Sequence, residues 1–275
     1  MELHEILRKV RDIKPTVQCI TNFVTINDCA NVLLAAGAAP TMAMDIREVE
    51  EVAGQADAVV CNLGAVEYVE SMLLAGRTAG ELGKPVVLDP VAAGGRTLRR
   101  ESALRLIREG NVTVIRGNAS EIRALALGRD GGDGVEVSSL DVINRENLPE
   151  SIKTVESFAE KSHTVVVVSG PLDVVSDGKR TAIIRNGCPT MARFTGSGCM
   201  ASALIGAFCA AAPGHPFEAA GAAMAVMGIC GEAAEKRRLK NGTGNATFRI
   251  DLIDAVFNLT EEQFKEMIRY EIYKG

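Results

Sequence analysis

Short apolar runs that alternate with helix-like stretches are the feature that most restricts the fold of this chain. Five such runs stand out along the sequence: Val17–Thr21, Ala58–Leu63, Pro85–Asp89, Val112–Arg116 and Thr164–Ser169. Continuous apolar runs separated by helices are typical of strands that are buried on both faces of a sheet. We therefore predict an α/β fold with a mostly parallel central sheet and helices on both sides.

Helix-like stretches lie between and after these runs. Apolar spacing predicts helices over Asn27–Ala36 and Glu67–Leu82, each followed by a glycine that can end a helix. The last part of the chain reads as mostly helix, over Cys199–Ala212 and Pro216–Arg238. No linker or internal repeat interrupts the sequence, so we predict a single domain over residues 1–275.

Three further segments complete this outline. Val174–Gly178 and Thr181–Ile184 flank an Asp-Gly turn, which predicts a β-hairpin at an antiparallel edge of the sheet. Gly128–Ser139 is rich in Gly and Asp and is expected to form a surface loop. Glu2–Asp12 has apolar residues at helical spacing and predicts an amphipathic surface helix.

Charge and hydropathy exclude several classes of protein. The net charge of -5 and the pI near 5.4 argue against a broad nucleic-acid-binding face. The most apolar stretch, about Met200–Ala212, is too short to span a bilayer, and the charged N-terminus lacks the apolar core of a signal peptide. The seven cysteines lack zinc-ligand spacing. We expect a cytoplasmic protein with free thiols and no membrane or nucleic-acid partner.

Polar residues stand at the carboxyl ends of the five apolar runs. These residues are Asn22, Asn62, Asp89, Arg116 with Asn118, and Ser169. Open parallel sheets bind their ligands at this edge. Polar residues are common wherever a strand meets a loop, but five such ends together predict a shared cleft.

The sharpest local motif is Thr195-Gly196-Ser197-Gly198-Cys199, immediately before an apolar helix. Glycines let the backbone approach a ligand closely, and the first turn of a helix offers free N–H groups and a dipole that favours negative charge. The motif therefore predicts a phosphate-binding turn. Taken alone, it is also compatible with a tight, glycine-assisted helix entry that binds nothing.

Cys199 lies at the start of the predicted helix. A thiol at a helix N-terminus has a lowered pKa, so this one is expected to accept a proton from a substrate hydroxyl. A lone cysteine beside an apolar helix is also a common core residue, and the motif alone does not decide between the two.

Four further segments accompany that turn, in order along the chain: Thr21–Asn27 with Ala30-Asn31, Gly37–Met42, Leu88–Val91 and Arg116–Glu121. Together with Gly196–Cys199 they closely resemble the hydroxyethylthiazole kinase family of the ribokinase-like superfamily. The superfamily carries Gly-x-Gly-Asp at this loop–helix junction, and Cys in place of Asp is typical of the thiazole kinase branch. The resemblance spans nearly the whole chain. It implies a three-layer α/β/α ribokinase-like fold and ATP-dependent phosphorylation of the primary hydroxyl of hydroxyethylthiazole.

The resemblance also implies a role for single residues. Cys199 would activate the hydroxyl of the substrate. The residues implied for the thiazole site are Met42, Asn27 and Gly196. Those implied for ATP are Arg116, Ser169, Gly198 and Asn118, and those implied for Mg²⁺, partly through water, are Asp89 and Glu121. The family further implies a homotrimer with the thiazole site between subunits.

Several of these residues have another interpretation on sequence alone. Arg116 offers a planar donor fork for phosphate, but most arginines form surface ion pairs. Asp89 needs a cation if it is unpaired, yet Asp before Pro is also a common start of a turn. Asn118 and Glu121 are three residues apart and can cap a helix together. Met42 is of a type that more often fills a core.

The sequence departs from the family pattern at two places. Ala92 stands where Gly is expected after Leu88–Val91, which matters if that backbone has a positive φ. The segment Gly242–Asn245 stands where a Gly-Pro-Gly-Ser type of loop is usual. These departures concern local loop geometry rather than the class of reaction.

Other functions on the same fold remain open. An ATP- or ADP-dependent NAD(P)H-hydrate dehydratase also uses a glycine-rich loop, but it normally carries Asp at the position of Cys199. A kinase for another small vitamin-like alcohol would share both fold and chemistry. A non-catalytic nucleotide- or thiazole-binding regulator would not need Asp89, Arg116 and Glu121 together with the glycine turn.

Overall fold

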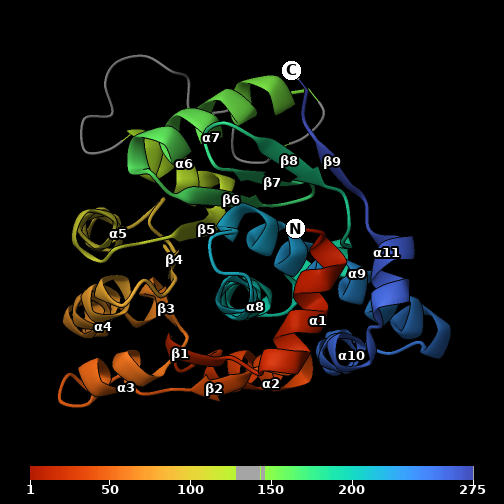
Figure 1. Cartoon of the computed structure of the whole chain (residues 1–275). Coiled ribbons are helices and arrows are strands. Elements are labelled where there is room, and N and C mark those ends of the chain that lie inside the picture. Colours follow the sequence, from red (N-terminus) through yellow and green to blue (C-terminus); the bar gives the residue numbers. More distant parts are fainter. Residues whose placement is uncertain (128–142, 144–145, 275) are drawn as a thin grey trace.

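The computed structural model describes residues 1–127, 143 and 146–274. Within them, one sheet has the strand order β2-β1-β3-β4-β5-β6-β7-β8-β9 (Figure 1). Six neighbouring strands are parallel: β1 (Thr16–Ile20), β2 (Ala39–Thr41), β3 (Ala58–Asn62), β4 (Val86–Asp89), β5 (Val114–Asn118) and β6 (Val165–Ser169). The antiparallel strands follow: β7 (Asp173–Ser176), β8 (Thr181–Ile184) and β9 (Tyr270–Ile272).

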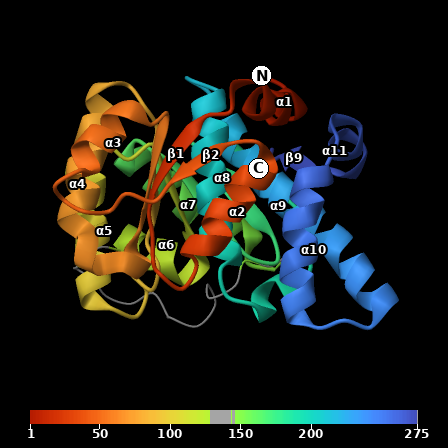
Figure 2. The ribbon, with the colours of Figure 1, turned by 90° about the horizontal axis from the view of Figure 1, so that it is seen from below.

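Helices cover both faces of the sheet (Figure 2). One layer contains α1 (Leu3–Ile13), α2 (Ile26–Ala36), α8 (Ser197–Ala211), α9 (Pro216–Asn241), α10 (Asn245–Asn258) and α11 (Glu261–Met267). The other contains α3 (Val49–Gln55), α4 (Val69–Glu81), α5 (Thr97–Glu109), α6 (Ala119–Leu127) and α7 (Leu148–Ser162). Two 3-10 turns, η1 (Leu63–Tyr68) and η2 (Pro189–Arg193), complete the described elements.

Buried strand residues alternate between two hydrophobic cores. Val60 faces the core formed with α8 and α9, whereas its neighbours Val59 and Cys61 face the core formed with α4 and α5. Successive strand side chains point to opposite faces, so a run that is apolar throughout fills both cores at once. The predicted three-layer α/β arrangement is confirmed by this packing.

The predicted elements are largely present, with differences at the edges of the sheet. The hairpin at Asp177-Gly178 forms as predicted between β7 and β8, but β9 pairs outside β8 and occupies the antiparallel edge. Strands β2 and β9 are only three residues each. Each pairs with one neighbouring strand, β2 with β1 and β9 with β8. The predicted loop Gly128–Ser139 lies outside the described residues.

The helix predicted over Glu67–Leu82 begins later than expected. The Asn62 side chain accepts a hydrogen bond from the Gly64 N–H, which starts the separate turn η1, and Ala65 within that turn has non-helical dihedrals. The α-helix itself runs over Val69–Glu81. A side-chain cap at the end of β3 therefore decides where the helix starts.

Helix α9 is apolar along much of its length. By length and composition it is the one helix in the described part of the chain that could cross a membrane, but 83% of its most apolar window is buried inside the protein. It packs against α8 and α10 in the core. Its apolar character is accounted for by this packing.

Candidate active site

The polar residues at the carboxyl ends of the strands form one continuous row. In strand order, Asn22 Nδ2 donates to Asn62 Oδ1 (3.1 Å), and Asn62 Nδ2 donates to Asp89 Oδ2 (3.0 Å). Asp89 Oδ2 lies 3.7 Å from Arg116 Nη1, and Arg116 Nη2 donates to Ser169 Oγ. The row follows β1, β3, β4, β5 and β6, so the strand ends that the sequence singled out carry a connected set of side chains.

The glycine turn lies against this row. Gly196 has φ +107°, a conformation that favours glycine, and α8 begins at the next residue. The first bond of the helix joins the Met200 N–H to the Gly196 carbonyl (2.9 Å), which leaves the N–H groups of Ser197, Gly198 and Cys199 without an acceptor inside the helix. The predicted anion-binding turn therefore has the donors that it needs.

Gly198 allows this turn to approach Arg116. A Cβ added at Gly198 would lie 2.4 Å from Arg116 Nη1. The guanidinium side chain is 12% exposed, and its Nε–H has no partner in the described residues. Backbone N–H groups and a positive side chain thus converge on one place at the start of α8. Such a convergence suits a phosphate group.

Cys199 is the third residue of α8, and two amide groups contact it. Asn62 Nδ2 and Asn22 Nδ2 lie 3.3 Å and 3.5 Å from its sulfur. Burial, and then the charge of Asp89, raise the pKa of the Cys199 thiol above its ordinary value, while hydrogen bonds and Arg116 act in the opposite direction. The prediction of a lowered pKa was therefore wrong, because burial is the largest influence on the pKa of this thiol.

Asp89 is buried, being only 1% exposed, at the centre of the row. Its Oδ2 accepts hydrogen bonds from Asn62 and from Ser202 Oγ (2.8 Å), whereas its buried Oδ1 has no partner in the described residues. Burial raises the pKa of Asp89 to about 6, the charge of Glu121 adds to this, and Arg116 opposes it. An orphaned carboxylate oxygen next to a phosphate-binding turn fits a bound cation.

Glu121 is more strongly tied to the backbone than the sequence suggests. Its Oε2 accepts from the Asn118 N–H (2.8 Å), and the Glu121 N–H donates to Asn118 Oδ1 (2.9 Å). This reciprocal pair is the helix cap considered above, at the start of α6. Glu121 Oε1 accepts from the Ala92 N–H (2.8 Å), so the carboxylate also holds the loop after β4.

Ala92 has φ +61°, in the left-handed region that glycine adopts freely. The family expectation of Gly at this position therefore reflects the backbone conformation, and Ala adopts it at a cost of about 1–2 kcal/mol. The hydrogen bond to Glu121 holds the loop in this conformation. At the other departure, Gly242 ends α9 with φ +65° and Gly244 precedes α10.

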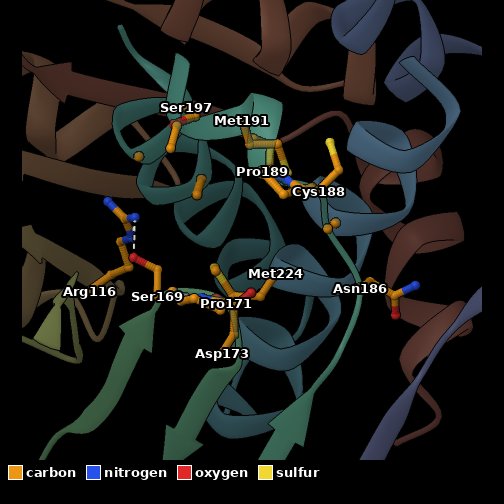
Figure 3. Close-up of a pocket in the computed structure, with 17 residues that line it drawn as sticks. Arg116, Ser169, Pro171, Asp173, Asn186, Cys188, Pro189, Met191, Ser197 and Met224 are labelled. Carbon is orange, nitrogen blue, oxygen red and sulfur yellow. Dashed lines mark hydrogen bonds between the residues drawn. The ribbon is translucent and has the colours of Figure 1, made fainter. Parts of the chain in front are cut away.

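A cavity of about 560 Å³ opens beside the glycine turn. Of the predicted ATP-binding residues, Arg116, Ser169 and Gly198 line it, together with Ser197 (Figure 3). Asn118 is not part of this lining and is engaged in the cap of α6. The end of the cavity nearest Arg116 therefore lies next to the glycine turn at the start of α8.

The lining away from Arg116 is rich in sulfur, and Asn186 and Asp173 add polar side chains to it. Figure 3 shows Cys188 and Met191 across the cavity from Arg116 and Ser169, and Met224 and Met227 add to the lining. Apolar side chains of this kind suit a flat heterocycle. No periodic pattern in the sequence marks this wall, because its residues come from the loop before η2, from η2 and from α9.

Asp173 is a lining residue that sequence reasoning missed. It is 7% exposed at the start of β7, and its Oδ1 accepts from the Gly170 N–H (2.9 Å), which shapes the turn after Ser169. Burial raises the pKa of Asp173 to about 7. Ser202 was also missed. Its spacing of three residues from Cys199 on the predicted helix would have placed both on one face.

The residues predicted for the thiazole site lie around α2 and β2. A Cβ at Gly196 would lie 3.3 Å from Asp28 Oδ2, so the glycine turn abuts the first turn of α2. Asn27 in that turn is exposed, and its side chain accepts a hydrogen bond from Asn31 (3.0 Å). Met42 follows β2 and is half-buried against the core. Neither Asn27 nor Met42 lines the cavity described above.

A model of the hydroxyethylthiazole kinase family matches residues 7–262. The chain belongs to this family. The hydroxyethylthiazole kinase of Clostridium acetobutylicum is 43% identical over 273 residues, which cover 98% of this chain and all of the relative. That of Exiguobacterium sibiricum is 44% identical over 263 residues, covering 95% and 98%.

Solved structures agree with the family assignment. A hydroxyethylthiazole kinase protein from Pyrococcus horikoshii superposes with a TM-score of 0.87 at 37% identity and covers 99% of both chains. A pyridoxal kinase from Staphylococcus aureus, in complex with AMP-PCP and pyridoxal, has a TM-score of 0.59 at 16% identity over 80% of this chain and 88% of that one. The second likeness concerns the fold alone. The predicted ribokinase-like fold is confirmed.

Proposed function

We propose that this protein phosphorylates the primary hydroxyl of hydroxyethylthiazole with ATP, giving the thiazole phosphate used in thiamine biosynthesis or salvage. The observation that carries the proposal is the glycine turn at Gly196–Cys199, whose free N–H groups lie beside Arg116 at the mouth of the cavity. Family membership supports the same reaction.

ATP would lie in the cavity with its phosphates at the polar end. The N–H groups of Ser197 and Gly198 and the guanidinium of Arg116 would stabilise the charge on the phosphoryl group during transfer. The heterocyclic base would lie toward the sulfur-rich wall at Met224 and Met227. Phosphoryl transfer depends mainly on position and charge, and these groups supply both.

Cys199 would accept the proton of the alcohol late in the transfer. Its sulfur lies where the start of α8 meets the polar row, in contact with Asn22 and Asn62. The alcohol oxygen would lie between this thiol and the glycine turn. Because burial raises its pKa, only a small share of the thiol is ionised at neutral pH. We therefore expect turnover to rise with pH through the neutral range.

Mg²⁺ is the cation that the family implies. Among the described residues, no group of three or more His, Cys, Asp and Glu side chains could hold a metal by itself. Asp89 offers one orphaned buried oxygen, and Glu121 lies close enough to raise its pKa, so the two would share the cation with ATP phosphates and water. When bound, Mg²⁺ would offset the negative charge of those phosphates.

The thiazole site would be completed by a second subunit of a homotrimer. Phe23 and Val24, just before α2, are 80% and 59% exposed, and Asn27 beside them is exposed as well. Exposed apolar side chains next to a half-built site favour an interface. Phe23→Asp should therefore shift the sedimentation profile from trimer to monomer and abolish thiazole turnover. A trimeric Phe23→Asp protein would contradict this assignment.

A coupled ADP-release assay tests the reaction. The panel of acceptors is hydroxyethylthiazole, hydroxymethylpyrimidine, pyridoxal and ribose, with product identified by mass spectrometry. We expect hydroxyethylthiazole to give the highest kcat/KM. Higher kcat/KM with another acceptor would reassign the substrate, and no release with any acceptor would favour a binding protein. Cys199 in place of the usual Asp argues against an NAD(P)H-hydrate dehydratase. Conversion of hydrated NADH to NADH by the protein would instead support that activity. We expect a cytoplasmic enzyme, as the sequence suggests.

A further inference from the structure

The side chain of Asn62 contacts both the Asp89 carboxylate and the Cys199 thiol. It stands at the end of β3, directly opposite Asp89 in the parallel register with β4, and is 1% exposed. Its Nδ2 donates to Asp89 Oδ2 (3.0 Å) and lies 3.3 Å from Cys199 Sγ. One amide group therefore contacts the cation-holding carboxylate and the proton-accepting thiol at once.

The carboxamide of Asn62 is fully hydrogen-bonded. Its Oδ1 accepts from the Gly64 N–H (2.9 Å) and from Asn22 Nδ2 (3.1 Å), so both acceptor positions are used as well as both donor hydrogens. The orientation of the group follows from its partners. Asp89 Oδ2 can only accept and the Gly64 N–H can only donate, so a flipped amide would oppose like groups at both ends.

Asn22 supports the same arrangement from the neighbouring strand. Its Nδ2 contacts Asn62 and lies 3.5 Å from Cys199 Sγ, while its Oδ1 accepts from the Thr25 N–H (3.2 Å). The sulfur thus faces two amide donors whose own positions are set by backbone groups. Hydrogen bonds of this kind favour the thiolate and offset part of the effect of burial.

We propose that Asn62, held by Asn22, is a positioning residue that fixes Cys199 and Asp89 relative to each other for phosphoryl transfer. This role rests on the proposed kinase function. The alternative is that Asn62 only caps the turn η1 through the Gly64 N–H, in which case its loss would affect stability and leave the chemistry unchanged.

Asn62→Ala tests the role directly. We expect kcat with hydroxyethylthiazole to fall about 10- to 100-fold, as for the loss of hydrogen bonds to charged groups, while KM for ATP stays within about twofold. In the Cys199→Ala background, the fold-decrease in kcat caused by Asn62→Ala should be at least about five times smaller, because the two residues act together. Equal losses in both backgrounds would refute the positioning role.

Gly64→Ala should displace the side chains of Asn62 and Asn22 without removing any of their hydrogen-bonding groups. An added Cβ would lie 2.7 Å from Asn62 Oδ1 and 2.8 Å from Asn22 Nδ2, so both side chains must shift. We expect a lower kcat in a folded protein. Wild-type kcat here would refute the role even if Asn62→Ala failed to fold. Ser176→Ala is the control, since Ser176 is a fully buried polar residue in the β7–β8 hairpin and should affect stability alone.

Different results would refute the kinase function and the positioning role of Asn62. Absence of ADP release by the wild-type protein would refute the kinase function and the positioning role with it. Turnover by the wild type that depends on Cys199, together with an unchanged kcat in Asn62→Ala, would refute only the positioning role.

Discussion

The two halves of the carboxyl edge of the sheet differ in how complete they are. Around β5 and β6, the cavity beside Arg116 is lined by residues of η2, α8 and α9 of the same chain. Around β1, β2 and α2, Asn27 is exposed and Phe23 is 80% exposed. The proposed nucleotide half is thus lined by one chain, whereas the proposed thiazole half presents apolar side chains to its surroundings.

This difference indicates how binding of ATP and choice of the acceptor alcohol would depend on different parts of the fold. The nucleotide half uses groups fixed by strand ends and a helix start, which follow from the fold itself. The proposed thiazole half would depend on side chains that are exposed in one chain, such as Asn27 and Phe23. Substitutions in the first half should therefore affect the chemistry and ATP, and substitutions in the second half should affect the acceptor.

The largest effect is expected at the junction of the two halves. Cys199→Ala should lower kcat by about 10²- to 10⁴-fold while the Kd for ATP stays near the wild-type value, because only the proton acceptor is lost. Cys199→Asp should remain active, since relatives on this fold use Asp there. Steady-state ADP release and calorimetric ATP titration measure both quantities. If Cys199→Ala turned over at the wild-type rate, Cys199 would not be the proton acceptor.

Gly198→Ala should damage the nucleotide half next. The new Cβ would lie 2.4 Å from Arg116 Nη1 and push the guanidinium out of place. We expect kcat/KM for ATP to fall about 10- to 100-fold through the loss of a charge-assisted contact. Gly54→Ala is the matched control, because nothing lies within 4 Å of a Cβ there. Equal kinetics in the two variants would show that the close approach of Gly198 to Arg116 is unimportant.

Met42→Lys should affect the thiazole half alone. A charged side chain in an apolar pocket disfavours a neutral heterocycle, so KM for hydroxyethylthiazole should rise about tenfold and KM for ATP much less. Leu98→Lys, at a 64% exposed position on α5, serves as the control. A parallel rise of both KM values would remove Met42 from the pocket and weaken the contrast between the halves.

The smallest effect on catalysis is expected for Asp173→Asn, which instead changes the pH dependence of stability. Burial raises the pKa of Asp173 to about 7 from 3.8, so the folded state holds the proton more tightly than the unfolded state. Its contribution to stability is therefore complete below about pH 4 and is lost as the pH rises through about 7.

The asparagine of this variant has no proton to lose, and it keeps an oxygen that can accept from the Gly170 N–H as Asp173 does. Between about pH 5 and 7 the free energy of unfolding of the wild type should fall relative to that of Asp173→Asn, by up to about 1.4 kcal/mol per pH unit. Urea titrations at several pH values measure the difference. Parallel curves for the two proteins would mean that Asp173 is already ionised at pH 5.

Some features could be predicted from sequence because they depend on neighbouring residues. The αL stop at Gly37, the hairpin at Asp177-Gly178 and the helix start at Gly196 are local, and each is present in the structure. The roles of Asp173 and Ser202 could not be predicted in this way. The partner of Ser202 is Asp89 on a distant strand, which only the folded chain brings close. The partner of Asp173 is Gly170, three residues away, but the burial of Asp173 beside the cavity depends on the fold.

The sequence by itself determined the layers and the polar edge, because apolar runs that fill both cores must be covered on both faces and must end in polar residues at the cleft. Family membership follows from motifs that are contiguous in the chain. Tertiary structure alone decided the state of Cys199: its helix position predicts a lowered pKa, but burial beside Asp89 raises it. Desolvation depends on what surrounds a group, and only the packed fold supplies those surroundings.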